Sequence, residues 1–456
     1  MKIALSEKFT YKKLIRFTLP TIVMMIFTSI YGVVDGVFVS NCVGSDAFAA
    51  VNLIMPVAMI LGTIGFMMGT GGSALVSKTI GEGDTEKANR YFSMLIYLLV
   101  IIGTLFTILG TIFVEPLARL LKADETMMPD CITYGRTLIL FLVPFCLQNA
   151  FSSFMIVAEK PTFGLIISII AGVTNMFLDF LFMYVFKMGV FGAALATGIS
   201  QVVGVVIPLV YFISGKNKIL RFTKTKIELS PMLQVCINGS SEMVTNLSMS
   251  LINILFNAKL MELVGANGVS AYGVIMYVGF LFSGTYVGYS VGSAPVISYH
   301  YGAGNKEELK SLLNKSLKLL GITALVMTSL AEIFAKPLAS IFTSYDKELL
   351  ELTTNAIKLY SISYIISWFN IFASSFFTAL NDGFVSALIS FLRTLVFQVI
   401  AILVLPNIWG INGIWLSVVI AEVFSVIVSL ICFEVNKKKY GYGISKNCEI
   451  EKCSVA

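Results

Sequence analysis

The sequence predicts an all-α integral membrane protein with twelve transmembrane helices in two pseudo-symmetric six-helix lobes. Three observations lead to this fold class. The composition is far more apolar than that of a soluble domain, the apolar residues fall into twelve runs long enough to cross a bilayer, and the second half of the chain repeats the first.

The composition places most of the chain in lipid. Hydrophobic residues make up 57% of the sequence and charged residues 13%, whereas a soluble domain carries about 25% charged residues. The mean hydropathy of +0.87 agrees. The net charge of +6 does not indicate a nucleic-acid partner, because the basic residues occur in short clusters between apolar runs, as in membrane loops.

Enzymatic and metal-binding functions find little support in the sequence. The seven cysteines form no CxxC pair, and His300 is the single histidine, so we expect neither a metal cluster, nor a cofactor, nor the residue set of an intramembrane enzyme. The Gly-rich segment 69–73 lacks the G-K-[ST] of a phosphate-binding loop. An ATP-driven pump is therefore not predicted.

The apolar runs define the predicted helices in chain order. The first begins after a basic N-terminus that lacks a signal-peptide cleavage site, and each run approaches or exceeds the roughly 20 residues that a span needs. The runs cover residues 14–39, 48–77, 92–114, 134–157, 162–186, 189–213, 231–258, 268–299, 315–335, 354–379, 384–405 and 410–433. The predicted parts are a lobe over 1–213, a basic cytoplasmic linker over 214–230, a lobe over 231–433 and a cytoplasmic tail over 434–456.

Loop charge orients the chain. If the N-terminus is cytoplasmic and the spans alternate, most of the 32 Lys and Arg residues fall on the cytoplasmic side, as the positive-inside rule requires. We therefore expect a multi-pass protein of the cell membrane with both termini in the cytoplasm.

The two halves align at one constant offset without a gap. Gly71 aligns with Gly292, Gly81 with Gly302, and Pro116 with Pro337. Six spans per half is an even number, so the halves run in parallel and are related by an axis along the membrane normal. Two such lobes with a cavity between them suit alternating access.

Four ionisable residues stand out inside the runs, where a charge costs about 2.5–3.5 kcal/mol: Asp35, Asp179, Glu242 and Arg393. Asp35, Asn175, Asp179 and Thr197 come from three spans of the first lobe and share the outer half of the bilayer. Asn175 and Asp179 lie on one helix face. These oxygen-bearing groups can bind Na⁺ or hold a proton, unless waters and backbone satisfy them separately.

The other polar positions allow two interpretations each. Glu242 and Arg393 lie at similar depth and can form one buried ion pair with a functional role in the second lobe. The alternative is a purely structural pair, or snorkelling of these side chains at the lipid interface. Pro20, inside the first span, is either a hinge or a static kink. Because Asp35 aligns with Phe256 and Asp179 with Ile400, ion chemistry is expected mainly in the first lobe.

Three segments resemble the MATE family of multidrug and toxic-compound exporters, within a resemblance that covers about 14–433. They are VVDGVFVSNCVGSDAFAAVNLIMP (33–56), NMFLDFLFMYVFKMGVFGAALATGISQ (175–201) and GYSVGSAPVISYHYGAGN (288–305). The resemblance implies a cation or proton site at Asp35, Asn175, Asp179 and Thr197, and bending at Pro20. Some members have carboxylates in both the seventh and tenth spans, but the run 354–379 contains neither Asp nor Glu.

The resemblance also implies a function. Family members export large, often cationic, amphipathic compounds against H⁺ or Na⁺, so we expect a small-molecule exporter, acting as a monomer in the bilayer. The alternative is a flippase for lipid-linked precursors in the same superfamily. A flippase would need a cationic cavity for pyrophosphate, and Arg393 is the one basic residue that lies far from the ends of the predicted runs.

Overall fold

The computed structural model describes residues 3–443 except 44, 122, 124, 216, 218 and 345. The first lobe consists of α1 (Tyr11–Cys42), α2 (Ser45–Gly81), α3 (Thr85–Leu120), α4 (Met128–Leu140), α5 (Leu142–Val157), α6 (Pro161–Asp179), the π-helix η1 (Phe180–Val185) and α7 (Gly189–Ile213). The second lobe consists of α8 (Leu229–Val264), α9 (Ala266–Gly302), α10 (Lys306–Ile333), α11 (Ala335–Thr343), α12 (Lys347–Ser361), α13 (Tyr364–Ala379), α14 (Gly383–Phe391), the π-helix η2 (Leu392–Val396), α15 (Phe397–Val404), α16 (Pro406–Trp409) and α17 (Ile411–Tyr440).

The predicted twelve spans are confirmed in the described chain. Ten helical segments are long and apolar enough to cross a bilayer, and two bent pairs, α4 with α5 and α12 with α13, complete the twelve. These pairs bend by 50° and 48°. The bends follow Leu140 and Ser361, which are equivalent positions under the sequence repeat, so the two lobes share a local distortion as well as a helix order.

The end of the last span differs from the prediction. Helix α17 continues to Tyr440, beyond the expected boundary at residue 433. Its final turn is fixed by Asp382, which accepts hydrogen bonds from Lys439 Nζ at 2.9 Å and from the Tyr440 hydroxyl. The beginning of the predicted tail is therefore helical, and the part of that tail beyond Gly443 lies outside the described residues.

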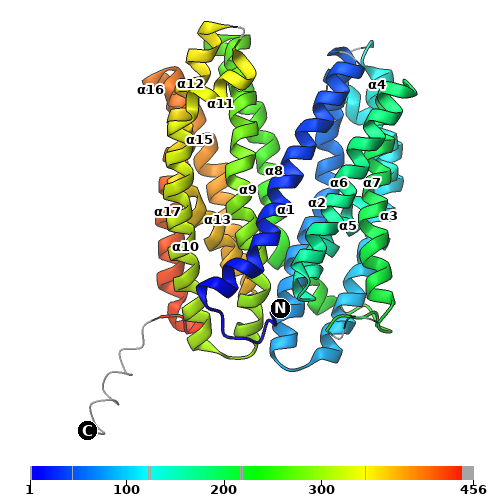
Figure 1. Ribbon diagram of the computed structural model, residues 1–456, viewed down its shortest axis with the longest axis vertical. Helices are drawn as coiled ribbons and strands as arrows, with labels where there is room; N and C mark the ends of the chain where they lie inside the picture. The colour runs from blue at the N-terminus through cyan, green and yellow to red at the C-terminus, as the bar shows by residue number, and fades with distance from the viewer. Residues whose placement is uncertain are drawn as a thin grey trace.

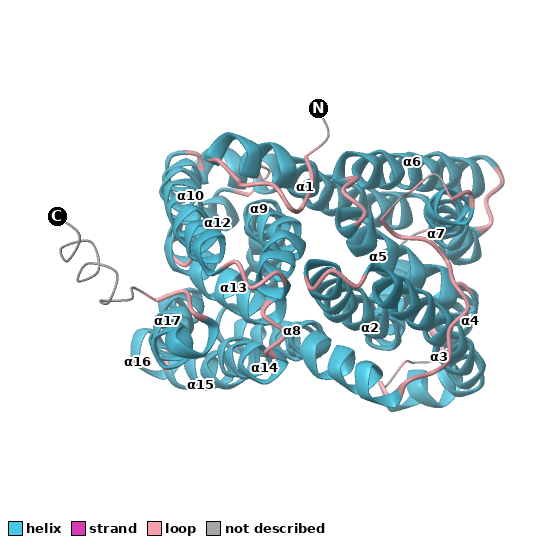
Figure 2. Ribbon diagram, turned by 90° about the horizontal axis from the view of Figure 1, so that it is seen from below, coloured by secondary structure: helices cyan, strands magenta, loops and turns pink. Residues whose placement is uncertain are grey.

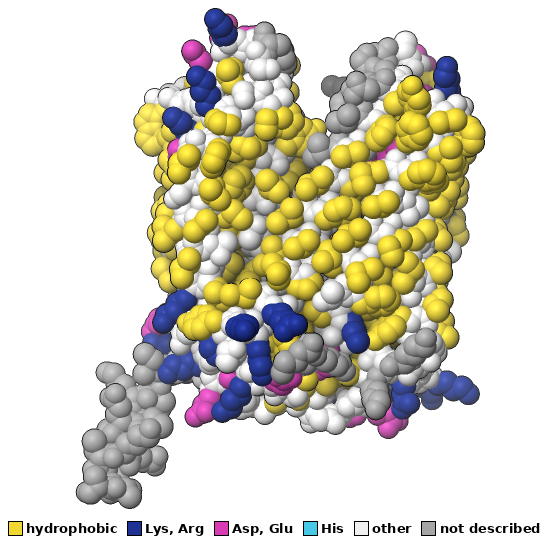
Figure 3. All heavy atoms as spheres, in the orientation of Figure 1, with side chains coloured by type: hydrophobic (Ala, Val, Ile, Leu, Met, Phe, Trp, Pro, Cys, Tyr) yellow, Lys and Arg dark blue, Asp and Glu magenta, His cyan; other side chains and the backbone are white. Residues whose placement is uncertain are grey.

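The two lobes are joined at one end of the molecule and separated at the other. Figure 1 shows two helix bundles that converge toward the end where α1 begins and α17 ends, and the view from that end in Figure 2 shows them side by side. In Figure 3 the opposite end is divided by a deep notch. The space between the lobes therefore opens away from the termini.

Reciprocal glycine contacts join the lobes at the closed end. A methyl group on Gly81 of α2 would lie 2.1 Å from the carbonyl oxygen of Tyr299, and one on Gly302 of α9 would lie 2.0 Å from that of Lys78. Gly81 and Gly302 are repeat equivalents, as are Lys78 and Tyr299. The contact thus obeys the pseudo-two-fold relation, and only glycine permits such close backbone approach.

The first helix of each lobe packs against the other lobe. Helix α1 passes α9 so closely that a methyl group on Gly288 would lie 2.6 Å from the Cα atom of Ile22. Helix α8 likewise packs on α2, where a methyl group on Gly71 would lie 2.3 Å from the carbonyl oxygen of Val235. Farther along, α1 packs on α6, where Gly172 meets Phe27. Helix α1 therefore links the two lobes, as Figure 1 shows.

Each lobe has its own apolar interior, and the outer surface is apolar too. Phe92 and Phe154 are fully buried in the first lobe, and Phe376 and Trp415 in the second. Large side chains such as Ile112 remain exposed on the outside. They form the broad hydrophobic surface in Figure 3, with Lys and Arg side chains near its terminal end. This distribution fits a protein whose surroundings are lipid.

Candidate ion-coupling site

Helices α1, α6 and α7 bring the predicted first-lobe residues together. Asp35 lies on α1, Asn175 and Asp179 on α6, and Thr197 on α7. Asn175 and Asp179 are one helical turn apart and are 2% and 0% exposed. Asn175 Nδ2 donates a long hydrogen bond of 3.5 Å to Thr197 Oγ1, so the amide and the hydroxyl face each other across the helix pair.

The Asp35 and Asp179 carboxyl groups form a pair. They lie close enough to interact electrostatically, and among the described residues neither oxygen of Asp179 has a hydrogen-bond partner. Two ionised carboxylates repel each other, and they can share a hydrogen bond only when one of them carries a proton. The arrangement is therefore suited to hold a proton or a cation.

The donor set also fits Na⁺. Hard cations prefer oxygen ligands, and two carboxyl groups, the Asn175 amide and the Thr197 hydroxyl supply oxygen atoms. Among the described residues no three His, Cys, Asp or Glu side chains gather as a metal site. The described residues thus contain no cluster of three such side chains for a metal ion that prefers nitrogen or sulfur ligands.

Two tyrosines that sequence reasoning missed adjoin this pair. Tyr134 of α4 interacts electrostatically with both Asp35 and Asp179, and Tyr31 of α1 interacts with Asp35. Tyr134 is 2% exposed. Nothing in the apolar runs distinguishes these tyrosines from the others. The position of Tyr134 near the pair depends on how α4 packs against α7 and α2, whereas Tyr31 lies one helical turn before Asp35 on α1.

The helix geometry changes at Asp179. Helix α6 ends at this residue and continues as the π-helix η1. π-Helical turns are rare and occur frequently at functional sites. The second lobe has its own π-helix, η2, in the span that corresponds to α6, and it carries Arg393. Each lobe therefore combines a wide helical turn with a buried polar group.

Pro20 lies inside α1, which continues through it as one helix. The residues that follow it, Thr21 and Ile22, touch Gly292 and Gly288 of α9. Asp35 is farther along the same helix, roughly 22 Å away by the α-helical rise. Pro20 thus lies where α1 contacts the second lobe, and Asp35 lies where it contacts the first.

Glu242 and Arg393, which the sequence allowed to pair, do not form an ion pair with each other. Arg393 instead binds Glu422 of α17: Nε donates to Oε1 at 2.8 Å, and Nη2 lies 2.8 Å from the same oxygen. Arg393 points into the interior of the second lobe, whereas Glu242 of α8 lines a small cavity against α2 of the first lobe. Similar depth in the membrane therefore did not mean proximity.

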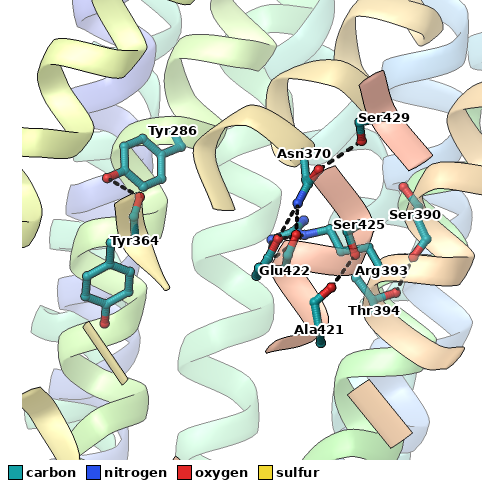
Figure 4. A network of polar contacts seen from close by, with 10 residues as sticks. All are labelled: Tyr286, Tyr364, Asn370, Ser390, Arg393, Thr394, Ala421, Glu422, Ser425 and Ser429. Atoms are coloured by element: carbon teal, nitrogen blue, oxygen red, sulfur yellow. Dashed lines mark hydrogen bonds and ion pairs between the residues drawn. The ribbon is translucent and has the colours of Figure 1, made fainter. Parts of the chain in front are cut away.

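The Arg393–Glu422 pair is embedded in a hydrogen-bonded network, shown in Figure 4. Asn370 Nδ2 donates to Glu422 Oε2 at 2.7 Å, and Ser429 Oγ donates to Asn370 Oδ1 at 2.9 Å. Glu422 was overlooked in the sequence, although it is the one acidic residue within the run 410–433. That isolation was the signal that could have identified it. The network leaves Arg393 and Glu422 paired with each other.

A sequence model of the MatE family matches residues 20–181 and 242–404. The chain belongs to the MatE family. One matched segment falls in each lobe, so the family domain occurs twice, as the internal repeat predicts. The first MatE segment contains Pro20, Asp35, Asn175 and Asp179, and the second contains Glu242 and Arg393.

Known MatE-type proteins resemble the chain over almost its whole length. The multidrug export protein MepA of Staphylococcus aureus is 23% identical over 420 residues, which cover 90% of this chain and 91% of MepA. A crystal structure of MATE in complex with MaL6 superposes with a TM-score of 0.90 at 22% identity, covering 96% of this chain and 98% of that one. The structure of an outward-facing multidrug resistance MATE family transporter superposes with a TM-score of 0.89 at 23% identity, with the same coverage of both chains. The MatE resemblance and the twelve-helix fold are therefore confirmed.

Proposed function

We propose that the protein is a secondary-active exporter that moves cationic amphipathic compounds out of the cell against H⁺ or Na⁺. The observation that carries the proposal is the pair of half-buried Asp35 and buried Asp179, in which Oδ1 of Asp35 and both oxygens of Asp179 have no hydrogen-bond partner among the described residues. Family membership supports transport rather than catalysis as the activity. The name of the Staphylococcus aureus relative, a multidrug export protein, supports drug-like cargo.

Exchange at the carboxyl pair supplies the coupling. A coupling ion that binds Asp35 and Asp179 neutralises them, and its release leaves a negative site that attracts a cationic substrate. Because the two ligands compete, each drives the other off when the site faces the appropriate side. One pH unit supplies about 1.4 kcal/mol per proton, and the membrane potential adds about 2.3 kcal/mol per charge per 100 mV.

Alternating access of the two lobes moves the site between the membrane faces. The structure has its lobes joined at the terminal end, where Gly81 and Gly302 approach the facing backbone, and open at the other end. We place the termini in the cytoplasm of a cell-membrane protein, which makes this the outward-open form. Helix α1 contacts both lobes and carries Asp35, so bending at Pro20 is the proposed link between ion binding and lobe movement.

Efflux from proteoliposomes tests the proposal. Ethidium-loaded vesicles receive either a pH gradient or a Na⁺ gradient, with wild type, Asp35→Asn, and Glu125→Gln as a control on an exposed acidic side chain. We expect gradient-driven efflux by wild type and the control, and its loss in Asp35→Asn. No gradient-dependent efflux by folded wild-type protein would reject drug export and favour a flippase for lipid-linked precursors.

A further inference from the structure

A second polar site lies between the lobes, separate from the Asp35–Asp179 pair. Here the described residues enclose a cavity of about 20 Å³, which is room for about one water molecule. Helices α2 and α5 of the first lobe and helices α8 and α13 of the second contribute its polar lining. These residues are Thr70, Ser73, Ser153, Glu242, Ser375 and Thr378.

Three of these hydroxyl groups have already donated their hydrogen atoms to backbone carbonyls. Thr70 Oγ1 donates to the carbonyl of Phe66 at 2.9 Å, Ser73 Oγ to that of Thr70 at 2.9 Å, and Ser375 Oγ to that of Ser290 at 3.2 Å. A hydroxyl has a single hydrogen to donate but two lone pairs. These side chains can therefore only accept hydrogen bonds from a group in the cavity.

Glu242 adds a negative charge to this acceptor-rich lining. No described residue forms an ion pair or a hydrogen bond with its carboxylate, which lies about one helical turn beyond the close contact of Gly239 with Met67. An isolated charge at membrane depth is costly and marks a functional group by default. A carboxylate that faces these acceptors is satisfied by a proton or by a positively charged ligand.

We propose that this cavity binds a monovalent cation of about the size of a water molecule, either Na⁺ or the ammonium end of a larger compound. Glu242 supplies the counter-charge, and the hydroxyl oxygens of Thr70, Ser73 and Ser375 supply further ligands. An anion is excluded by the same lining, and a neutral guest would leave the Glu242 charge without a partner.

The position of the cavity ties its occupancy to the lobe arrangement. Thr70 and Ser73 belong to the first lobe and Ser375 to the second, so the complete ligand set exists only while the lobes are joined. A cation in the cavity stabilises the joined arrangement, and separation of the lobes divides the ligands and releases it. A ligand that binds one arrangement better shifts the equilibrium toward it.

Radioligand binding to purified protein tests the inference without relying on transport. The background variant is Asp35→Asn/Asp179→Asn, which silences the first-lobe pair. Binding of ²²Na⁺ and of ¹⁴C-methylammonium is then measured with Glu242→Gln added, or with Glu262→Gln added as a control. Glu262 lies on the same helix, α8, but its side chain is 64% exposed.

We expect the background variant to retain one saturable site for one of the two probes. Glu242→Gln should weaken binding by roughly tenfold or more, because it removes the negative charge that faces the cation, and Glu262→Gln should leave it unchanged. Binding of ²²Na⁺ but not methylammonium would identify the free ion as the ligand. Binding of methylammonium but not ²²Na⁺ would identify the ammonium end of a larger compound as the ligand. If Glu242→Gln does not fold, Ser375→Ala should weaken the same binding.

Two results would overturn the inference: no saturable binding of either probe by the folded background variant, or binding that Glu242→Gln and Ser375→Ala leave unchanged. Neither result would affect the proposed export function, which is tested by the efflux of wild type and Asp35→Asn.

Discussion

The two lobes hold their buried charges differently. In the first lobe Asp35 and Asp179 face each other without a described donor for Asp179. In the second, Arg393 and Glu422 neutralise each other, and Asn370 provides a further hydrogen bond. A satisfied pair has no need of a mobile ion, whereas two facing carboxyl groups do. The chemical difference between otherwise similar lobes explains why ion exchange is assigned to the first.

Breaking the second-lobe pair should destabilise the protein. Glu422→Ala leaves Arg393 buried without its counter-charge, which costs about 3–5 kcal/mol. Arg393→Met/Glu422→Leu removes both charges and should recover most of that stability. Thermal unfolding in detergent micelles, followed by intrinsic fluorescence, measures both. Equal losses in the single and double variants would contradict the assignment of a structural ion pair.

At the residue scale, the sequence predicted the positions of polar residues better than it predicted which residues interact with each other. The four-residue spacing of Asn175 and Asp179 correctly placed both on one helix face. The estimated depths of Asp35 and Thr197 in neighbouring spans of the first lobe predicted that they lie near this face. Helical rise also gave Glu242 and Arg393 similar depths. The helical rise gives the depth of a side chain but not the direction in which it points. The partner of Arg393 could therefore be identified only from the packing of η2 against α17.

At the scale of helices, hydropathy predicted every span but not the local distortions. The bends between α4 and α5 and between α12 and α13, and the π-helical turns η1 and η2, lie within predominantly apolar runs. Hydropathy depends on composition, whereas these features depend on the hydrogen-bonding register of the backbone. The end of α17 was misplaced for a related reason, because Lys439 and Tyr440 are polar residues held in the helix by Asp382.

The Pro20→Ala variant distinguishes the two interpretations of Pro20, as a hinge or as a static kink. Proline in a helix interior is about 3 kcal/mol less favourable than alanine, so the variant should stiffen α1 and leave stability equal or higher. If Pro20 is a hinge, ethidium efflux slows while cation binding at Asp35 is retained. Pro208→Ala, inside α7, is the matched control and should transport normally. Unchanged efflux by Pro20→Ala would mean that the kink is static.

At the scale of the whole molecule, the repeat predicted two parallel lobes, and the structure adds which end is joined. Under the proposed alternating access, one sequence encodes two arrangements of the lobes, so sequence alone does not select one. The glycine contacts of α2 and α9 select the observed arrangement. Gly81 and Gly302 were already visible as aligned residues, and their backbone contacts give that alignment a physical reason.

Widening this contact should open the joined end. In Gly302→Val, the new Cβ atom would lie 2.0 Å from the carbonyl oxygen of Lys78, so the ends of α2 and α9 must move apart. Spin labels at Glu82 and Glu307 should report a longer distance by electron–electron double resonance. Gly273→Val is the control on the same helix, since nothing lies within 4 Å of its added Cβ. An unchanged distance in Gly302→Val would show that this contact does not hold the lobes together.

The central claim is that a substrate and a coupling ion exclude each other at Asp35 and Asp179, and ion release on substrate binding tests it most directly. Ethidium is added to purified protein in weakly buffered solution while a pH indicator reports released H⁺ and ²²Na⁺ displacement is counted. The account predicts release of about one H⁺ or Na⁺ per ethidium bound by wild type, because linkage between competing ligands is reciprocal, and none by Asp35→Asn/Asp179→Asn. Saturable ethidium binding by wild type with no release of either ion would contradict the exchange mechanism.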